Sequence, residues 1–392
     1  MVFNTIFKNH NSAFLNISMN KLIVKFLLLV LPFFLTNCID PVEPEFEFKE
    51  GLVFIEGIAT TVKGGSYVII NKSVNEFGIN KTKFENGASV SFVNSLTGQV
   101  VELVELEGAY VPSIEFKANV GEQWEIDVVL EDGRQYRSQP ETVLESVPIS
   151  NIKAFYNPEL QYNDGTGSFE PGHAISITFD DPVNEENYYY WTFKSYENLL
   201  VCQVCFDGIY RDGLCGPTSI STPDYFSYTC DTDCWKIRYP ESISIFDDKF
   251  SNGKTTTDLI VANVPLYTKE NIVVEIQQLS LTPDAFDYYK VLKDLVDNNS
   301  GFNAPPPAAL IGNIYNPNDA DDFVFGRFTA AATSSADIFI KRGDIPENSL
   351  ETQMPLSIEP TFMSPYPPPA TIEAPCNEGR FKTAIQPEAW MN

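Results

Sequence analysis

The sequence predicts a mainly β protein with two antiparallel sandwich-like domains and one helix in its C-terminal half. Short runs rich in Val, Ile and aromatic residues recur from Leu52 onward, and turn-forming Gly, Asp, Asn and Pro residues separate them. The clearest run, QWEIDVVL at 123–130, places its Trp, Ile, Val and Leu side chains on one face. Such a period of two indicates strands with one buried side, which is the pattern of a sandwich.

The chain begins with the features of an export leader. Two lysines precede an apolar core at residues 27–35, and the segment ends in LTNC at 35–38. A charged start followed by an apolar stretch of this length is typical of a secretory signal and is too short for a membrane span. The last four residues resemble a bacterial lipobox. We therefore expect residues 1–37 to be a signal peptide with its true start at Met19, and Cys38 to carry the lipid.

Residues 38–50 follow as a tether. Its two prolines and alternating acidic residues favour an extended chain. The acid-rich stretch is also similar to the surface-export signals of Bacteroidetes lipoproteins, whereas a solvated spacer is the alternative, and the sequence leaves both open.

We expect the first domain at residues 51–146. Several strand-like runs lie there, and Asp132-Gly133 is typical of a hairpin turn between two of them. Short strands at this spacing predict an immunoglobulin-like antiparallel sandwich. The pattern resets near Val147-Pro148, where we place the boundary to a second β-rich domain at residues 147–392.

The second domain combines further strands with a cysteine-rich loop at 202–234 and a helix at 283–298. Thr282 can cap this helix, Pro283 suits its first position, and Asp284 favours the positive end of the helix dipole. Apolar residues then repeat at helical spacing until an Asn-Asn-Ser-Gly stop signal.

The composition excludes several classes of function. The net charge of -27 becomes -30 without the leader, because the leader carries three lysines and no acid. Such an acidic surface repels nucleic acid and anionic headgroups. It could serve solubility alone or attract cationic partners and divalent ions. His173 is the one histidine after the leader, so a multi-histidine metal site is excluded, and its turn-rich surroundings predict an ordinary loop residue. The sequence contains no phosphate loop, nucleophile elbow, zinc-protease motif or dinucleotide fingerprint.

Six cysteines follow Cys38, and an even number in an exported protein predicts disulfides. They are Cys202, Cys205, Cys215, Cys230, Cys234 and Cys376. Zinc binding and a redox-active C-x-x-C pair remain alternatives. Five of the six lie in the cysteine-rich loop, so full pairing requires a bridge from Cys376 to that loop. Cys202 and Cys205 are poor partners in a straight strand, because they would lie about 10 Å apart on opposite faces.

Two further groups of residues are candidates for binding. Aromatic residues in or beside the cysteine-rich loop could anchor an interface or pack locally: Tyr210, Tyr225, Phe226, Tyr228 and Trp235. An oxygen-rich run could ligate calcium or form Asx turns: Asn316, Asn318, Asp319, Asp321 and Asp322. This run lacks the Gly and the terminal Glu of an EF-hand loop. We expect no catalytic residues and no cofactor.

A series of short motifs then points to a family. In chain order they are LVFIEG (52–57), NGASV (86–90), GAY (108–110), DGRQYRS (132–138), PET (140–142), PPPA (305–308), GNIY (312–315), FGRF (325–328), PC (375–376) and PEAW (387–390). In this order they resemble the DUF4249 lipoproteins of Bacteroidetes, whose biochemical function is unassigned. Members are typically encoded beside TonB-dependent outer-membrane receptors, so the resemblance implies a surface companion of a transporter and supplies no catalytic residues.

Together with the leader and the tether, the resemblance implies an outer-membrane lipoprotein on the cell surface. We expect it to capture a ligand for a TonB-dependent transporter or to be an accessory subunit of one. The alternative is a structural or assembly factor of the cell envelope that binds other proteins. A hydrolase that uses acids such as Asp180 or Asp321 is the third hypothesis.

Overall fold

The computed structural model describes residues 50–163, 165–183, 185–217, 223–297, 310–352, 354–359 and 372–391. The chain divides into two compact units, Met1–Phe48 and Lys49–Asn392, and every described residue belongs to the second. The expected signal peptide, the lipidation site Cys38 and the tether up to residue 49 lie outside the described residues.

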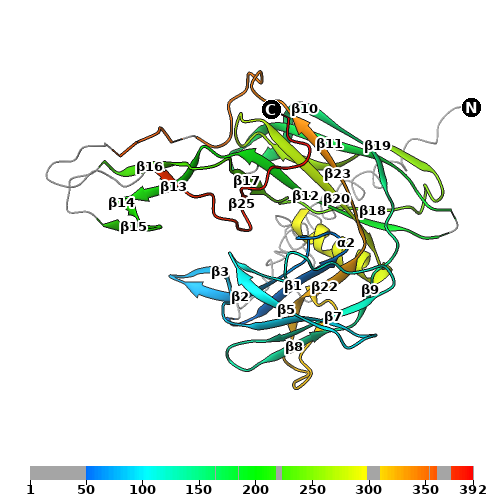
Figure 1. The fold of residues 1–392 in the computed structure, drawn as a ribbon. Coiled ribbons are helices and arrows are strands. Elements are labelled where there is room, and N and C mark those ends of the chain that lie inside the picture. The colour runs from blue at the N-terminus through cyan, green and yellow to red at the C-terminus, as the bar shows by residue number, and fades with distance from the viewer. Residues whose placement is uncertain are drawn as a thin grey trace, which may run out of the picture. The chain divides into compact units, whose positions relative to one another are not determined.

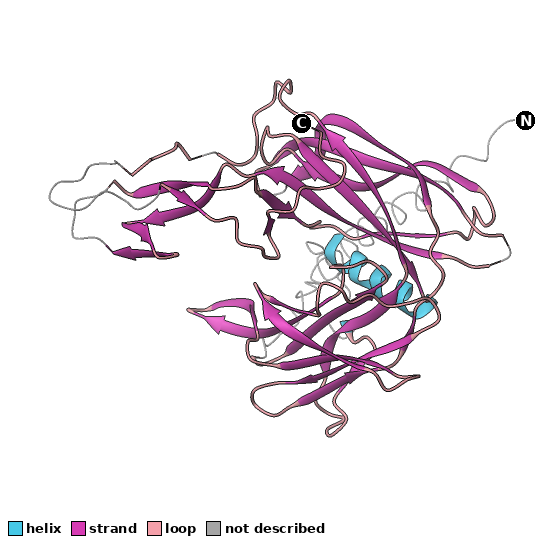
Figure 2. Ribbon diagram, viewed as in Figure 1, coloured by secondary structure: helices cyan, strands magenta, loops and turns pink. Residues whose placement is uncertain are grey.

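The predicted fold class is confirmed, because strands dominate the described chain and a helix lies in its C-terminal half (Figures 1 and 2). The largest sheet, called the first sheet below, has eleven strands. They are β1 (Val53–Thr60), β2 (Tyr67–Glu76), β3 (Ile79–Phe84), β4 (Ser89–Asn94), β5 (Val100–Leu106), β6 (Ala109–Val111), β7 (Gln123–Val129), β8 (Gln135–Ser138), β9 (Glu141–Thr142), β21 (Ile314–Tyr315) and β22 (Val324–Ala331). Their order is β21-β8-β7-β4-β5-β6-β2-β1-β22, with β3 paired to β2 and β9 to β7.

The first sheet encloses a large apolar core. Alternate residues of β7 are buried, as the period of two predicts, and Trp124 and Ile126 are among them. Phe92 of β4 packs against Phe328 of β22 with ring centroids 5.7 Å apart. The sheet can surround this core because its ends meet, where Ile311 just before β21 bridges to β22.

Two strands of the first sheet come from the C-terminal half of the chain. β22 pairs with β1 in parallel, from Val53 opposite Val324 to Thr60 opposite Ala331, and β21 pairs with β8. The expected antiparallel domain at residues 51–146 does not include these two strands, so the first sheet extends beyond it. The apolar pattern identifies each strand, but it does not encode which other strand covers its free edge.

Two further sheets pack face to face and form the second sandwich. The first of them contains β10 (Ile149–Asn163), β11 (Ser168–Asp180) and β19 (Thr255–Pro265). The second contains β12 (Tyr188–Asn198), β17 (Trp235–Arg238), β18 (Ser244–Asp247), β20 (Ile272–Leu281), β23 (Thr333–Ile340) and β25 (Lys382–Thr383). Phe179 of β11, Trp191 of β12 and Ile276 of β20 are buried in the core between them.

Helix α2 (Pro283–Asp297) begins and ends within one residue of the prediction. The N–H of Ala285 donates to Oγ1 of Thr282 at 3.3 Å, so Thr282 is the expected cap. The buried Phe286 and Tyr289 pack into a cluster with Ile58 of β1 and residues of β20 and β22, so α2 connects the two sandwiches. In the described part of the chain, no helix has the length and apolar character needed to cross a membrane.

The cysteine-rich segment at 202–234, which the sequence predicts as a loop, contains short strands. They are β13 (Val201–Phe206), β14 (Gly208–Arg211), β15 (Leu214–Pro217) and β16 (Tyr225–Cys230), and β16 also pairs with β24 (Glu373–Ala374) near the C-terminus. These strands, β24 and Cys234 and Cys376 are called the cysteine module below. Strands of four to six residues between Gly, Pro and Asp are too short to show a clear period in the sequence.

Candidate functional site

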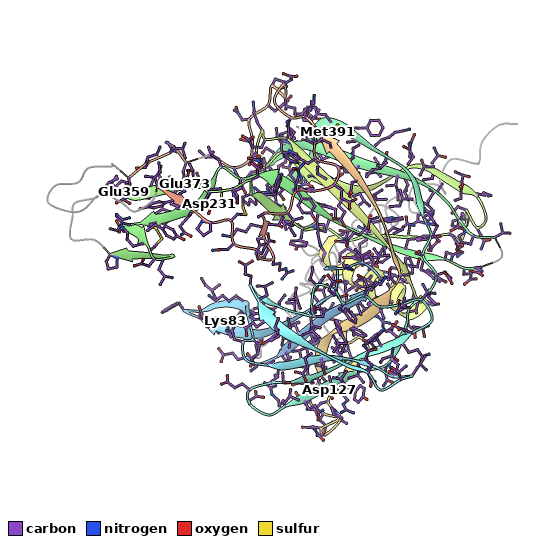
Figure 3. All side chains as sticks on the ribbon, viewed as in Figure 1. Lys83, Asp127, Asp231, Glu359, Glu373 and Met391 are labelled. Atoms are coloured by element: carbon purple, nitrogen blue, oxygen red, sulfur yellow. A yellow bond between two sulfur atoms is a disulfide. The ribbon has the colours of Figure 1, made fainter. Side chains whose placement is uncertain are left out.

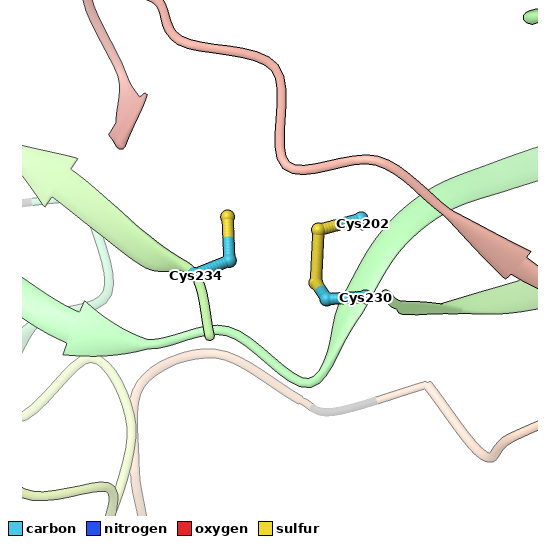
Figure 4. Close-up of side chains that lie close together, drawn as sticks. All are labelled: Cys202, Cys230 and Cys234. Carbon is cyan, nitrogen blue, oxygen red and sulfur yellow. A yellow bond between two sulfur atoms is a disulfide. The ribbon is translucent and has the colours of Figure 1, made fainter. Parts of the chain in front are cut away.

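The six cysteines after Cys38 form three disulfides in the cysteine module. The pairs are Cys202–Cys230, Cys205–Cys215 and Cys234–Cys376. The sulfurs of Cys202, Cys230 and Cys234 lie within 4.8 Å of one another (Figure 4), which is a spacing that also suits a metal ion. Because each sulfur is bonded to another sulfur, none of the three offers the thiolate that zinc requires.

Four of the five aromatic candidates are buried. They are Tyr210, Phe226, Tyr228 and Trp235. The Tyr210 and Tyr228 rings pack 5.3 Å apart, and Trp235 meets Trp390 edge-on at 5.8 Å. The half-buried Tyr225 donates its hydroxyl to the Pro355 carbonyl at 2.8 Å. These rings therefore pack locally, which was one of the two alternatives for them, and Tyr225 keeps the most accessible surface of the five.

A buried carboxylate holds the centre of the cysteine module. Glu359 lies on the module that also carries Asp231 and Glu373 (Figure 3), and it accepts hydrogen bonds from both terminal nitrogens of Arg211, at 2.9 and 2.5 Å. The Tyr228 hydroxyl donates to the same group at 2.5 Å. Burial alone would raise the pKa of Glu359, but these hydrogen bonds outweigh it and hold the pKa below its usual value.

The oxygen-rich run at 316–322 lies at the wall of a cavity of about 380 Å³ beside β21. This volume falls within the range of about 300 to 1,000 Å³ that is usual for ligand sites. The polar lining residues are Gln139, Asn313, Tyr315, Asn316, Asp319 and Asp322. Tyr315 and Phe323 add exposed rings, with 40% and 59% of their surface accessible.

Hydrogen bonds within the run account for its shape. Oδ1 of Asn316 accepts the N–H groups of Asn318 and Asp319 at 2.9 and 3.2 Å, and Oδ1 of Asp319 accepts the N–H of Asp321 at 3.0 Å. These contacts are Asx turns, which was the alternative to calcium binding. They occupy oxygens that a cation would need, so the geometry adds no support for a calcium site.

Asp322 is fixed in the cavity wall. One carboxylate oxygen accepts the Tyr136 hydroxyl at 2.8 Å and the Asn316 amide at 2.9 Å, while the other lies 4.0 Å from Arg134. Burial raises the pKa of Tyr136, and the bond to Asp322 raises it further, so the phenol remains a donor. The cavity thus presents an oriented carboxylate rather than a mobile one.

A buried ion pair that the sequence reasoning missed lies next to this cavity. Glu141 of β9 pairs with Arg327 of β22, and it also accepts hydrogen bonds from Asn313 at 3.2 Å and Thr282 at 3.0 Å. Burial raises the pKa of Glu141, and the charge of Arg327 opposes that rise. The motifs PET, GNIY and FGRF and the cap of α2 therefore meet at one point. Lone charged residues inside apolar strand patterns were the signal that could have indicated it.

Asp181 and Asp248 form a second buried feature that the sequence reasoning missed. Asp181 accepts the Tyr189 hydroxyl at 2.5 Å and the Gly253 N–H at 3.0 Å. Burial raises the pKa of Asp248, and the charge of Asp181 contributes to the rise. The neighbouring Asp180, named in the hydrolase hypothesis, accepts a hydrogen bond from Thr255 instead of joining the pair. The acids connect two loops of the second sandwich.

Comparison with models of known protein families assigns the chain to a family. A protein-family model described as "Domain of unknown function (DUF4249)" matches residues 39–337. The chain belongs to this family. A search of curated proteins with this chain finds no match.

The residues matched by the DUF4249 model include every described residue that lines the cavity and the Glu141–Arg327 pair, because the match ends later, in β23. The motifs at 375–376 and 387–390, which contributed to the resemblance, lie beyond it. Cys376 therefore belongs to a C-terminal tail outside the matched DUF4249 residues, although its disulfide attaches that tail to Cys234 inside them.

Proposed function

We propose that this DUF4249 protein is a non-catalytic outer-membrane lipoprotein that captures a ligand as the accessory subunit of a TonB-dependent transporter. The observation that carries the proposal is the leader that ends in LTNC at 35–38, followed by an acidic tether. Lipid on Cys38 would anchor the chain, with about 0.8 kcal/mol for each buried CH₂ group, and the acidic body would face the medium.

The cavity beside β21 supports ligand capture. Its walls combine exposed rings with oriented carboxylates, a combination that is common in small-molecule sites. Among the described residues, no lysine or arginine lines the cavity, so it favours neutral or cationic ligands over anions. Hydrogen bonds fix the positions of Asp319 and Asp322 in the cavity wall, and fixed carboxylates suit ligand binding rather than proton transfer.

Purification of the full chain from membranes tests the proposal. A C-terminally tagged chain should incorporate palmitate and, after cross-linking, should co-purify with a β-barrel receptor. Cys38→Ala should abolish palmitate incorporation and release the protein from membranes, whereas Cys376→Ala, the matched control, should retain the lipid.

The opposite results distinguish the alternative. Absence of palmitate would overturn the lipoprotein assignment. A lipidated chain without a barrel partner would overturn the transporter role. A deletion strain with normal nutrient uptake but altered surface proteins would indicate an envelope assembly factor.

A further inference from the structure

A second cavity, of about 170 Å³, lies between the first sheet and helix α2. Its sheet wall is the outer face of β1, β2 and β22. Phe54 is opposite Asn71 on one neighbouring strand and opposite Phe325 on the other. Tyr288 and Tyr289 of α2 form the facing wall. The cavity is therefore bounded by regular elements on both sides.

Glu56 places a carboxylate at this cavity. It lies on the same face of β1 as Phe54, because alternate residues of a strand share a face. Among the described residues, the one hydrogen bond to its carboxylate comes from the Tyr67 hydroxyl at 3.4 Å. Arg327 lies opposite Glu56 on β22 but pairs with Glu141. Glu56 therefore has no ion-pair partner in the described part of the chain.

Four of the eleven described residues that line the cavity are aromatic, two on the sheet and two on α2. Phe54 and Phe325 stack with centroids 5.2 Å apart. Tyr289 stacks on Tyr190 at 4.7 Å and meets Tyr288 edge-on at 5.6 Å. The faces and edges of these rings are held by packing, so the wall is formed before any ligand arrives.

The charge of Glu56 reaches the hydroxyls around it. After burial, which is the main cause, that charge raises the pKa of four phenols: Tyr67, Tyr190, Tyr288 and Tyr289. The protein around Glu56 also desolvates its carboxylate and raises its pKa, although the side chain keeps accessible surface on its strand. Arg380 lowers that pKa, but its guanidinium lies over the rings of Tyr67 and Tyr239, at 5.5 and 5.3 Å.

We propose that this cavity binds a small organic ammonium ion. Glu56 would supply the counter-charge, and the rings of Phe54 and Tyr288 would contact the alkyl groups and attract the cation by their quadrupoles. An anion would be repelled, and a neutral ligand would leave the carboxylate uncompensated. A divalent metal would need about six to eight oxygen ligands, and the cavity offers one carboxylate.

This inference goes beyond the proposed function, because it concerns a different cavity and stands with or without a transporter partner. The cavity also lies inside the matched DUF4249 residues. Its volume of about 170 Å³ is below the range of about 300 to 1,000 Å³ that is usual for ligand sites, so it admits only a compact head such as a trimethylammonium group.

Calorimetry on the full chain tests the inference with two isosteric probes. Choline should bind, and 3,3-dimethyl-1-butanol, which has the same shape without the charge, should bind at least ten times more weakly. Glu56→Gln should weaken choline binding at least tenfold and leave the alcohol unchanged. Tyr288→Leu should weaken choline binding as well. The matched control is Glu102→Gln, an exposed acid on β5 of the same sheet, which should bind choline as the wild type does.

Three results would overturn the inference. They are no choline binding at millimolar concentration, equal affinity for both probes, or unchanged choline affinity in Glu56→Gln. Glu56 keeps accessible surface and its raised pKa means that its charge adds no stability, so Glu56→Gln should not lower the melting temperature, and Glu56→Lys provides a second variant that should abolish binding.

Discussion

The cysteine module and the first sheet differ in what holds them together. The core of the first sheet contains twenty-one buried residues, none of them cysteine, with Trp124 and Tyr136 among the largest. The core of the module contains seven, of which three are cysteines. A small set of buried residues supplies little hydrophobic stabilisation, so the module depends on covalent bonds where the sheet depends on packing.

The two regions also use buried ionic groups differently. Glu141 in the first sheet has a raised pKa, so burial outweighs its partners there. Glu359 in the module has a lowered pKa, so its partners outweigh burial. Apolar packing around the Glu141–Arg327 pair offsets the cost of burying its charges. The module has the smaller apolar core, and there the Glu359–Arg211 pair contributes to stability directly.

Removing the Cys234–Cys376 disulfide should have the largest effect, and its local effect should fall on the module. The bond closes a loop of 142 residues, so the chain-entropy estimate of its contribution to the free energy of unfolding is about 5 kcal/mol, against about 3.6 for Cys202–Cys230 and about 2.7 for Cys205–Cys215. Hydrogen exchange of the Cys234→Ala/Cys376→Ala variant should show a larger loss of protection in β13 and β16 than in β7, because the module also loses the bond that joins its two segments. Equal loss in β7 would contradict the comparison.

Breaking the Glu141–Arg327 pair should be the next largest effect. Arg327→Met leaves a buried carboxylate without its partner, which is expected to reduce the free energy of unfolding by roughly 3–5 kcal/mol. The control is Lys153→Met, which breaks an exposed pair with Asp258 and should cost at most about 1 kcal/mol. Urea denaturation measures both, and similar losses would show that burial does not set the difference.

Glu359→Gln should destabilise the module in a pH-dependent way. At neutral pH it should cost roughly 1.5–3 kcal/mol, because hydrogen bonds to a charged group are lost. The folded pKa of Glu359 is below its unfolded value, so its contribution is present above the unfolded pKa and is lost as pH falls through the folded pKa. The difference between wild type and variant should therefore shrink on acidification in urea titrations. A constant difference would be the contrary result.

Thr282→Ala should give the smallest effect. The variant removes the cap of α2 and one hydrogen bond to Glu141, with an expected loss of about 1 kcal/mol. Thr282→Ser should recover most of this loss, since the hydroxyl alone makes both contacts. Thermal unfolding followed by circular dichroism distinguishes the two variants.

The sequence was sufficient for features that depend on neighbouring residues. The burial of Trp124 and the ends of α2 follow from local period and capping, and the structure agrees with both. Features that depend on distant segments were beyond it. The pairing of β1 with β22, the contact of Glu141 with Arg327 and the choice of partner for Cys234 each join residues far apart in the chain.

The candidate sites show the same limit. The aromatic residues near the cysteines were visible in the sequence, but their burial depends on disulfides whose pairing composition does not encode. The sequence does not single out Glu56 as a site residue, because a single acid in a strand usually faces solvent. Its significance arises only when α2 places two tyrosines opposite it.

The parallel pairing of β1 with β22 has a consequence for the order in which the first sheet can form. β1 is synthesised early, and its edge partner follows only when residues 324–331 have been made. The first sheet therefore cannot be completed while the chain is still being made, and the edge of β1 stays unpaired until β22 is available. We expect the first sheet to fold late and slowly, and we expect a chaperone to be needed to keep that edge from associating with other chains.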